Sequence, residues 1–242
     1  MSRLCCLLSN DWAPVLLWCA WGWCGVACVV SAGCSRSAPS SALHVYTASS
    51  LTEAFREMEV VFEAAHPGTD VVLNLAGSQV LRLQIEQGAR ADLFASANAE
   101  HMQALIDGGY VADRRTLATN RLAVIVPRDN PSHLQTAADL RQAKRLVIGT
   151  PNAPIGIYTR RFLEKAQMSE LLGRVVSEEP NVRLVRAKVE LGVADAAVVY
   201  HTDAVAVGEQ QVRTVAIPER WKLPEHESLP PPVPAYRPQE HS

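Results

Sequence analysis

Short apolar runs alternate with helix-spaced apolar positions along residues 43–217. The first run, Leu43 to Tyr46, is typical of a buried strand. It is followed by apolar residues at steps of four, three and four from Leu51 to Phe62, which places one apolar stripe on one face of a helix. The turn sequence His66-Pro67-Gly68 then ends that helix.

The same order of strand and helix recurs to the end of this region. The pattern predicts further strands at 71–75, 91–97, 121–127, 146–149 and 196–200, and helices near 80–88, 98–108, 137–143, 154–166 and 185–192. This alternation favours βαβ units around parallel sheets, which is an α/β fold. From Trp221 onward the chain is proline-rich and weakly patterned, so we expect that tail to be unpacked.

Several of the predicted helices begin with groups that can bind an anion. Ser49 or Ser50 stands where an N-cap belongs, with Glu53 as its capping-box partner, and Ser78 follows a glycine at the start of the next helix. Pro154 suits a first helical turn and leaves backbone N–H groups free around Ile155. A first turn carries unpaired N–H groups at the positive end of the helix dipole. A hydroxyl there either caps the helix or helps to hold an anion, and only the recurrence of such junctions favours the anion.

Composition excludes several classes of function. The chain has 242 residues, 48% of them hydrophobic, and a net charge of −2, so it is long enough for a sizeable core but has no basic excess for binding nucleic acid. All six cysteines fall at or before Cys34, so the rest of the chain has neither a disulfide nor a thiolate metal site. The seven histidines show no paired metal spacing. His201 lies near Asp203, but no nucleophile elbow accompanies them. We therefore expect neither an enzyme nor a cofactor.

The N-terminal residues 1–34 are expected to be an export signal. Val15 to Val30 is an uncharged run of about 16 residues, which is short for a membrane-spanning helix. The five residues that end at Cys34 resemble a bacterial lipoprotein signal, in which the cysteine becomes the lipidated first residue, although Ser31 stands where leucine is usual. An uncleaved single-pass anchor is the alternative. Residues 35–42 then form a flexible tether.

Seven stretches of the chain, taken in order, resemble the periplasmic molybdate-binding proteins of bacterial ABC uptake systems, which are type II solute-binding proteins. The stretches are Ala48-Ser49-Ser50-Leu51-Thr52, Ala76-Gly77-Ser78, Gln84-Ile85-Glu86-Gln87-Gly88-Ala89, Ala91-Asp92-Leu93-Phe94-Ala95-Ser96-Ala97, Pro154-Ile155-Gly156-Ile157-Tyr158, Asn181-Val182-Arg183 and Val199-Tyr200-His201-Thr202-Asp203-Ala204. The resemblance implies a two-lobed fold with the ligand cleft between the lobes. Lobe I would comprise residues 43–119 and 201–242, and lobe II residues 120–200.

The resemblance also implies five positions that hold a tetrahedral oxyanion. Ser50 and Ser78 would give hydroxyl and backbone N–H groups, Ile155 and Val182 backbone N–H groups, and Tyr200 its phenol. The family often has alanine where Ile155 stands, which affects the shape of the cleft more than its hydrogen bonds. Molybdate and tungstate carry only acceptors, so a site built of donors satisfies them, whereas a protonated phosphate brings a donor that meets no acceptor. No metal is implied beyond that of the oxyanion.

A family member would be exported, periplasmic or anchored to the membrane through a lipid, and monomeric, and would deliver molybdate to an ABC permease. Three alternatives remain open from the sequence. One is the same fold tuned to sulfate or another oxyanion, and another is a non-transporting sensory or degenerate protein. The third is an exported serine hydrolase that uses Ser50 or Ser78, although no base accompanies either serine.

The C-terminal part departs from the family pattern. Family members usually finish with a strand that returns to lobe I and a terminal helix, whereas the residues after Ile217 are proline-rich and have no helical periodicity. We therefore expect part of the apolar face of lobe I to be exposed. A chain of this kind would be truncated, frameshifted, or stabilised by the membrane or the transporter.

Overall fold

The computed structural model describes residues 41–112, 114–208 and 210–223. The expected export signal, Cys34 and most of the tether therefore lie outside the described residues, as does the proline-rich tail. Among the residues that are described, no helix is both long enough and apolar enough to cross a membrane.

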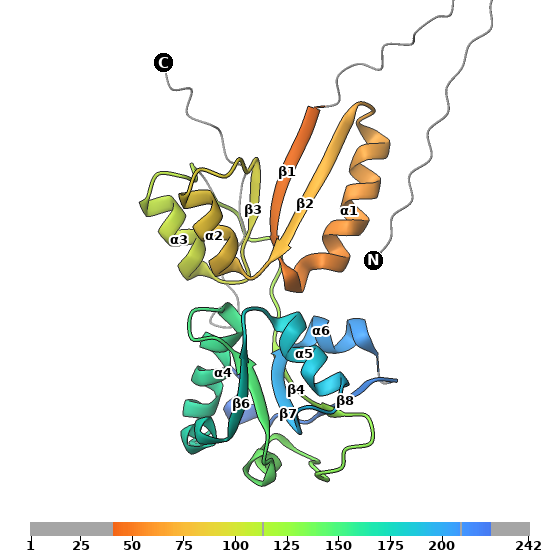
Figure 1. Cartoon of the computed structure of the whole chain (residues 1–242), viewed down its shortest axis with the longest axis vertical. Coiled ribbons are helices and arrows are strands. Elements are labelled where there is room, and N and C mark those ends of the chain that lie inside the picture. Colours follow the sequence, from red (N-terminus) through yellow and green to blue (C-terminus); the bar gives the residue numbers. More distant parts are fainter. Residues whose placement is uncertain (1–40, 113, 209, 224–242) are drawn as a thin grey trace, which may run out of the picture. The chain divides into compact units, whose positions relative to one another are not determined.

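The first lobe is built on a three-stranded parallel sheet. Its strands are β1 (Ser41–Ala48), β2 (Thr69–Ala76) and β3 (Leu93–Ala95), in the order β2-β1-β3. Its helices are the 3-10 turn η1 (Ser49–Leu51), α1 (Thr52–Ala65), α2 (Ser78–Glu86) and α3 (Ala99–Asp107). Phe55 of α1 packs with Val45 and Val71 on one face, while α2 and α3 pack with Phe94 on the other. Figure 1 shows α1 beside β2, and α2 and α3 beside β3.

The second lobe is built on a five-stranded mixed sheet. Its strands are β4 (Leu122–Pro127), β5 (Leu146–Gly149), β6 (Val175–Glu179), β7 (Ala196–Tyr200) and β8 (Val212–Val215), in the order β6-β5-β7-β4-β8. Its helices are η2 (Ala137–Gln142), α4 (Pro154–Lys165), η3 (Ser169–Arg174), α5 (Val182–Glu190), α6 (His201–Val207) and η4 (Glu219–Trp221). Residues of α5, α6 and the first half of α4 contribute to the buried cluster on one face of the sheet. Those of η2, η3 and the second half of α4 contribute to the cluster on the other.

The α/β character predicted from the sequence is confirmed, with two differences in detail. Only the first sheet is wholly parallel, because β4 runs antiparallel to both β7 and β8. The starts of the helices also differ in how they are capped. At the start of the helix predicted at 98–108, the side chain of Asn98 caps α3 by accepting a hydrogen bond from the backbone N–H of His101. In contrast, the N-cap residue of α1 is Leu51 and no side chain caps that helix, so the predicted cap at Ser49 or Ser50 is wrong.

The boundary expected for lobe I also needs correction within the described residues. Residues 201–242 were assigned to lobe I, but β8 pairs with β4, and α6 packs against α5, β4, β7 and β8 of the second sheet. Val212 and Val215 of β8 are buried against the second sheet, and their burial holds this short strand in the second lobe.

The first lobe leaves some apolar side chains exposed. On α1, Met58 and Val61 are 41% and 69% exposed. Part of the apolar surface of the first lobe is therefore open to solvent, as expected.

Candidate anion-binding site

Four of the five predicted site residues line one small cavity. Its lining residues are Ala48, Ser49, Ser50, Gly77, Ser78, Ala97, Pro154, Ile155, Asn181 and Val182. All but Ala97, which follows β3, come from the junctions at the starts of η1, α2, α4 and α5, so the cavity lies where four helix N-terminal ends converge. None of these lining side chains is charged. The cavity has a volume of about 10 Å³, which is about the space that one water molecule needs.

The Ser78 hydroxyl is oriented by the backbone of the first lobe. Its side chain is buried, and its Oγ accepts a hydrogen bond from the backbone N–H of Ala97 at 2.9 Å. The cap residue of α2 is Gly77, and no side chain caps this helix. Since a hydroxyl has one proton, and the contact with Ala97 uses only a lone pair, that proton is available to a ligand.

The second lobe presents backbone N–H groups. Pro154 occupies the first position of α4 and has no N–H, so the first donor of that helix belongs to Ile155. In α5 the side chain of Asn181 caps the helix by accepting from the N–H of Leu184 at 3.1 Å. That cap serves the third helical residue, which leaves the N–H of Val182 at the first position with no partner in its own helix.

Two glycines allow these helix starts to approach other backbone closely. A Cβ on Gly77 would lie 2.3 Å from the carbonyl oxygen of Pro180, so any other residue would push the start of α2 away from the start of α5. A Cβ on Gly156 would lie 2.0 Å from the carbonyl oxygen of Thr150. The first turn of α4 therefore packs directly on the backbone at the end of β5, which fixes the position of Ile155.

Tyr200, the fifth predicted residue, does not line the cavity but belongs to the buried cluster that contains Ala48, Ile155 and Val182. It ends β7, is 1% exposed, and its hydroxyl has no hydrogen-bond partner among the described residues. Burial, together with the nearby Tyr158 and Asp203, raises the pKa of Tyr200 well above its ordinary value. The phenol therefore stays protonated and remains a donor, and a buried donor of this kind calls for an acceptor.

Asp203 is a buried acid beside this group that the sequence did not single out as a site residue. It is 2% exposed, and its Oδ2 has no hydrogen-bond partner within the described part of the chain. Burial raises its pKa to about 7, although Arg186 and Arg183 oppose the shift. His201 contacts Arg121 at 3.0 Å, so the structure shows no acid–base pair between His201 and Asp203.

A serine hydrolase finds no support in the described residues. His101 is buried near the site, but its Nε2 is within hydrogen-bond distance of the backbone oxygen of Asn152, at 2.8 Å. No histidine hydrogen-bonds to Ser50 or Ser78 among the contacts of the described chain. The same residues hold no group of three acidic, histidine or cysteine side chains that could bind a metal ion.

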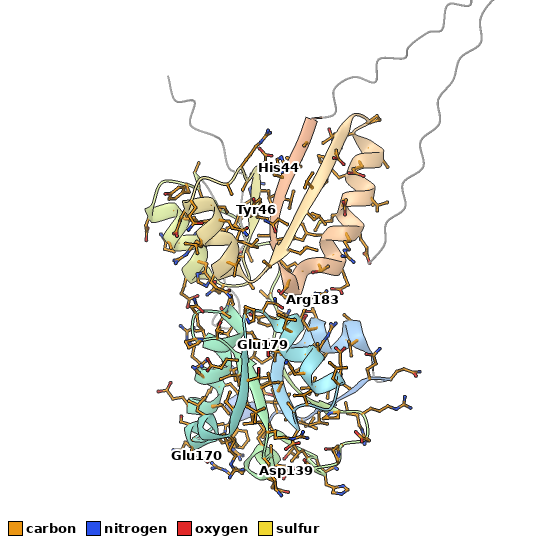
Figure 2. All side chains as sticks on the ribbon, in the orientation of Figure 1. His44, Tyr46, Asp139, Glu170, Glu179 and Arg183 are labelled. Atoms are coloured by element: carbon orange, nitrogen blue, oxygen red, sulfur yellow. The ribbon has the colours of Figure 1, made fainter. Side chains whose placement is uncertain are left out.

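Two side chains next to the predicted donors link the lobes, and sequence reasoning missed both. Gln79 Nε2 donates to the carbonyl oxygen of Pro180 at 2.6 Å. Arg183 Nε donates to the carbonyl oxygen of Ser49 at 2.6 Å, and its Nη2 donates to the carboxylate of Glu53. Figure 2 labels Arg183, which extends from the start of α5 toward the start of α1. Their partners are more than 100 residues away in sequence, so no local pattern could reveal these contacts.

Comparison with known proteins identifies the family. A family model described as bacterial extracellular solute-binding protein matches residues 43–238. The chain belongs to this family. Among curated relatives of this solute-binding protein, the molybdate-binding protein ModA of Mycobacterium tuberculosis is 37% identical over 204 residues, covering 80% of this chain and 77% of the relative. A Bacillus subtilis protein, YvgL, provisionally named an ABC transporter substrate-binding lipoprotein, is 32% identical over 188 residues, covering 74% and 72%.

A solved structure supports the fold of this solute-binding protein. The periplasmic molybdate-binding protein of Azotobacter vinelandii aligns with a TM-score of 0.65 at 19% identity, covering 82% of this chain and 87% of that one. The fold class and the family predicted from the sequence are therefore confirmed. Membership of a solute-binding family also confirms the expectation of a binding protein rather than an enzyme.

Proposed function

We propose that this solute-binding protein captures molybdate or tungstate and delivers it to the permease of an ABC transporter. The observation that carries the proposal is the convergence of uncharged donors from four helix starts on one cavity. Ser50, Ser78, Ile155 and Val182 would bind the oxyanion there, and Tyr200 would donate its phenol from the adjacent cluster. The names of the M. tuberculosis and A. vinelandii relatives support this choice of ligand.

A site without charged lining residues suits a fully ionised oxyanion. Oriented N–H dipoles at helix starts stabilise the negative charge in a dry cleft without a counter-charge. The donor set has no acceptor for a protonated anion, which disfavours phosphate. The cavity has room for about one water molecule, so entry of an anion with four oxygens requires the two lobes to part and then close around it.

The finer location of the protein is part of the same proposal. We propose that Cys34 is lipidated and holds the receptor at the outer face of the cytoplasmic membrane, where a permease would accept its cargo. The lipoprotein name of the B. subtilis relative supports the anchor. Mass spectrometry of the membrane fraction should find the lipidated Cys34 peptide, and a Cys34→Ser variant should leave that fraction.

Isothermal titration calorimetry tests the ligand. We expect molybdate and tungstate to bind, sulfate to bind more weakly because its smaller size fits the donors less well, and phosphate not to bind at neutral pH. A protein that bound sulfate more tightly than molybdate would be a receptor for a different oxyanion, and one that bound none of the four would contradict the proposal.

A double variant tests the assigned site. Ser50→Ala with Ser78→Ala removes two hydroxyl donors to a charged ligand, each worth roughly 10-fold or more in affinity. We therefore expect molybdate affinity to fall by about 100-fold or more in the same titration. Ser169→Ala is the matched control, because Ser169 is exposed at the start of η3 in the second lobe. Unchanged affinity in the double variant would show that the anion binds elsewhere.

A further inference from the structure

Two hydrogen bonds connect the lobes in a reciprocal way around the cavity. Gln79 directly follows Ser78, and its amide reaches the carbonyl oxygen of Pro180, two residues before Val182. Arg183 directly follows Val182, and its guanidinium reaches the carbonyl oxygen of Ser49, one residue before Ser50. Each side chain thus starts beside a proposed donor in one lobe and ends beside a proposed donor in the other.

The Gln79 contact is short and shielded from water. Gln79 is 8% exposed, and its Nε2 lies 2.6 Å from the Pro180 oxygen. The missing side chain of Gly77 lets the two segments come this close. A buried amide–carbonyl hydrogen bond is costly to break, because the groups left behind then lie unpaired away from water.

The Arg183 contact uses two faces of one guanidinium. Nε binds the Ser49 carbonyl oxygen, which also accepts from Thr52 Oγ1 at 2.7 Å, and Nη2 binds the Glu53 carboxylate. Burial raises the pKa of Glu53, but the hydrogen bond and charge of Arg183 outweigh this and hold that pKa below its ordinary value. The Arg183 and Glu53 side chains are 27% and 51% exposed, so the ion pair itself is open to solvent at the carboxylate. The part-buried hydrogen bond to the Ser49 carbonyl oxygen is therefore the stronger link of the two. The planar fork of arginine makes both contacts at once, which a lysine cannot reproduce.

We propose that Gln79 and Arg183 are positioning residues that hold the two halves of the anion site in register without touching the anion. The proposal rests on the proposed function of this site, because it concerns how the donors are held around the ligand. The affinity of a two-lobed receptor is reduced by the fraction of time that it spends open. Side chains that stabilise the closed arrangement therefore slow the release of the ligand and leave the choice among ligands to the donors themselves.

Variants that keep side-chain length test this role in the full-length protein. Gln79→Met is expected to weaken molybdate binding about 3- to 10-fold, and Arg183→Met about 10-fold or more, because the second also removes a charge-assisted contact. Stopped-flow measurements should place most of each loss in faster dissociation. Arg183→Lys should recover part of the affinity, since it keeps the charge but not the fork.

A further side-chain bridge between the lobes, more exposed than the first two, provides the matched control. Arg161 of α4 pairs with Glu100 of α3 at 3.0 Å, but their side chains are 46% and 44% exposed. Exposed pairs of this kind contribute little. Arg161→Met should therefore leave both affinity and dissociation rate within about two-fold of the unmodified protein.

Two readouts separate positioning from direct contact and from misfolding. The order and ratio of affinities for molybdate, tungstate and sulfate should stay constant in the Gln79 and Arg183 variants, and their unfolding temperatures without anion should stay close to that of the parent. Wild-type affinity in Arg183→Met, or a changed order of anions, would overturn the proposal. Loss of the folded state in Arg183→Met would leave Gln79→Met and Arg183→Lys to decide it by the same readouts.

Small-angle X-ray scattering keeps the inference testable even if the proposed ligand is wrong. Without any anion, the double variant Gln79→Met with Arg183→Met should have a larger radius of gyration than the parent, whereas Arg161→Met should not. If the parent binds no oxyanion but the double variant opens in this way, the proposed function fails and the positioning role stands. An unchanged radius of gyration in the double variant would refute the positioning role.

Discussion

At the scale of single residues, buried polar groups without partners in the described part of the chain indicate where this protein would bind its ligand. The Tyr200 hydroxyl lies in an apolar cluster with no hydrogen-bond partner among the described residues, which is an unfavourable place for a donor unless a ligand completes it. Neither this buried hydroxyl nor its surroundings could be predicted from the sequence, where Tyr200 is simply the last residue of an apolar run. The resemblance alone pointed to it.

Tyr200→Phe should therefore separate binding from stability. Removing an unpaired buried hydroxyl should leave the unfolding temperature without anion unchanged or slightly higher, while molybdate affinity falls by about 10-fold because a donor is lost. Thermal unfolding and calorimetric titration check the two effects. Tyr158→Phe is the control, because it removes a hydroxyl from a neighbouring ring that is not a proposed donor. The two rings lie edge-on, with their centroids 6.3 Å apart, and we expect this variant to keep its molybdate affinity. Full affinity in Tyr200→Phe would exclude the phenol from the site.

Asp203 gives the protein a distinct dependence of stability on pH. Its pKa is raised to about 7 in the folded chain, mainly by burial, against an ordinary value of 3.8. The folded state therefore holds a proton that the unfolded chain releases between about pH 4 and pH 7, so the free energy of unfolding falls as pH rises through this window. Above pH 7 the free energy of unfolding is lowered by a constant amount, at most on the order of 4 kcal/mol, because the folded state then holds a buried charge.

Asp203→Asn should remove this slope. We expect the variant to be more stable than the parent at pH 8, and the difference to shrink toward pH 5, in urea unfolding followed by circular dichroism. Asp195 has the opposite effect on how stability depends on pH. Burial raises the pKa of Asp195, but hydrogen bonds from Arg145 and Lys144 hold it below its ordinary value, so its contribution is lost as pH falls. A constant difference between Asp203→Asn and the parent at pH 5 and pH 8 would contradict the assignment.

At the scale of elements, the positions of the proposed anion-binding residues depend on where the helices begin. Periodicity located six of the eight described strands, all but β6 and β8, and most helices, because each apolar stripe is a local property of the chain. Strand direction is not local, so the antiparallel pairing of β4 was missed, and β8 and the seven-residue α6 lack a pattern long enough to detect. The starts of α3 and α4 were located to within a residue, whereas α5 begins three residues before the expected position. The bonds made by Gln79 and Arg183 depend on distant partners and could not be predicted.

A substitution at the start of α4 tests how closely this helix packs on the backbone that precedes it. Glycine to alanine normally stabilises a helix, but a Cβ on Gly156 would meet the carbonyl oxygens of Thr150 and Gly149 at 2.0 and 2.4 Å. Gly156→Ala should therefore destabilise the protein by about 1–3 kcal/mol and weaken molybdate binding by displacing Ile155. Gly173→Ala is the control, because nothing lies within 4 Å of its added Cβ. Chemical denaturation measures both, and equal stability of the two variants would contradict this packing.

At the scale of the whole molecule, the buried cluster on one face of the second sheet also includes Ala48 and Ala97 of the first lobe. The described chain passes between the two sheets once, between the end of α3 and the start of β4. Because α6 and β8 stay with the second sheet, the described residues return no strand to the first. Within the described part of the chain, side-chain contacts across the cavity, such as those of Gln79 and Arg183, supplement this one connection in keeping the donors together.

Most of the cavity's proposed donors belong to the main chain, and this has a consequence for how the protein can change over generations. Apart from proline, every amino acid carries the same backbone N–H, so exchanges at Ile155 or Val182 can alter the contour of the cavity without deleting a donor. Ligand chemistry of this kind can persist while most of the surrounding sequence diverges. Losing it would take a change in where the helices begin.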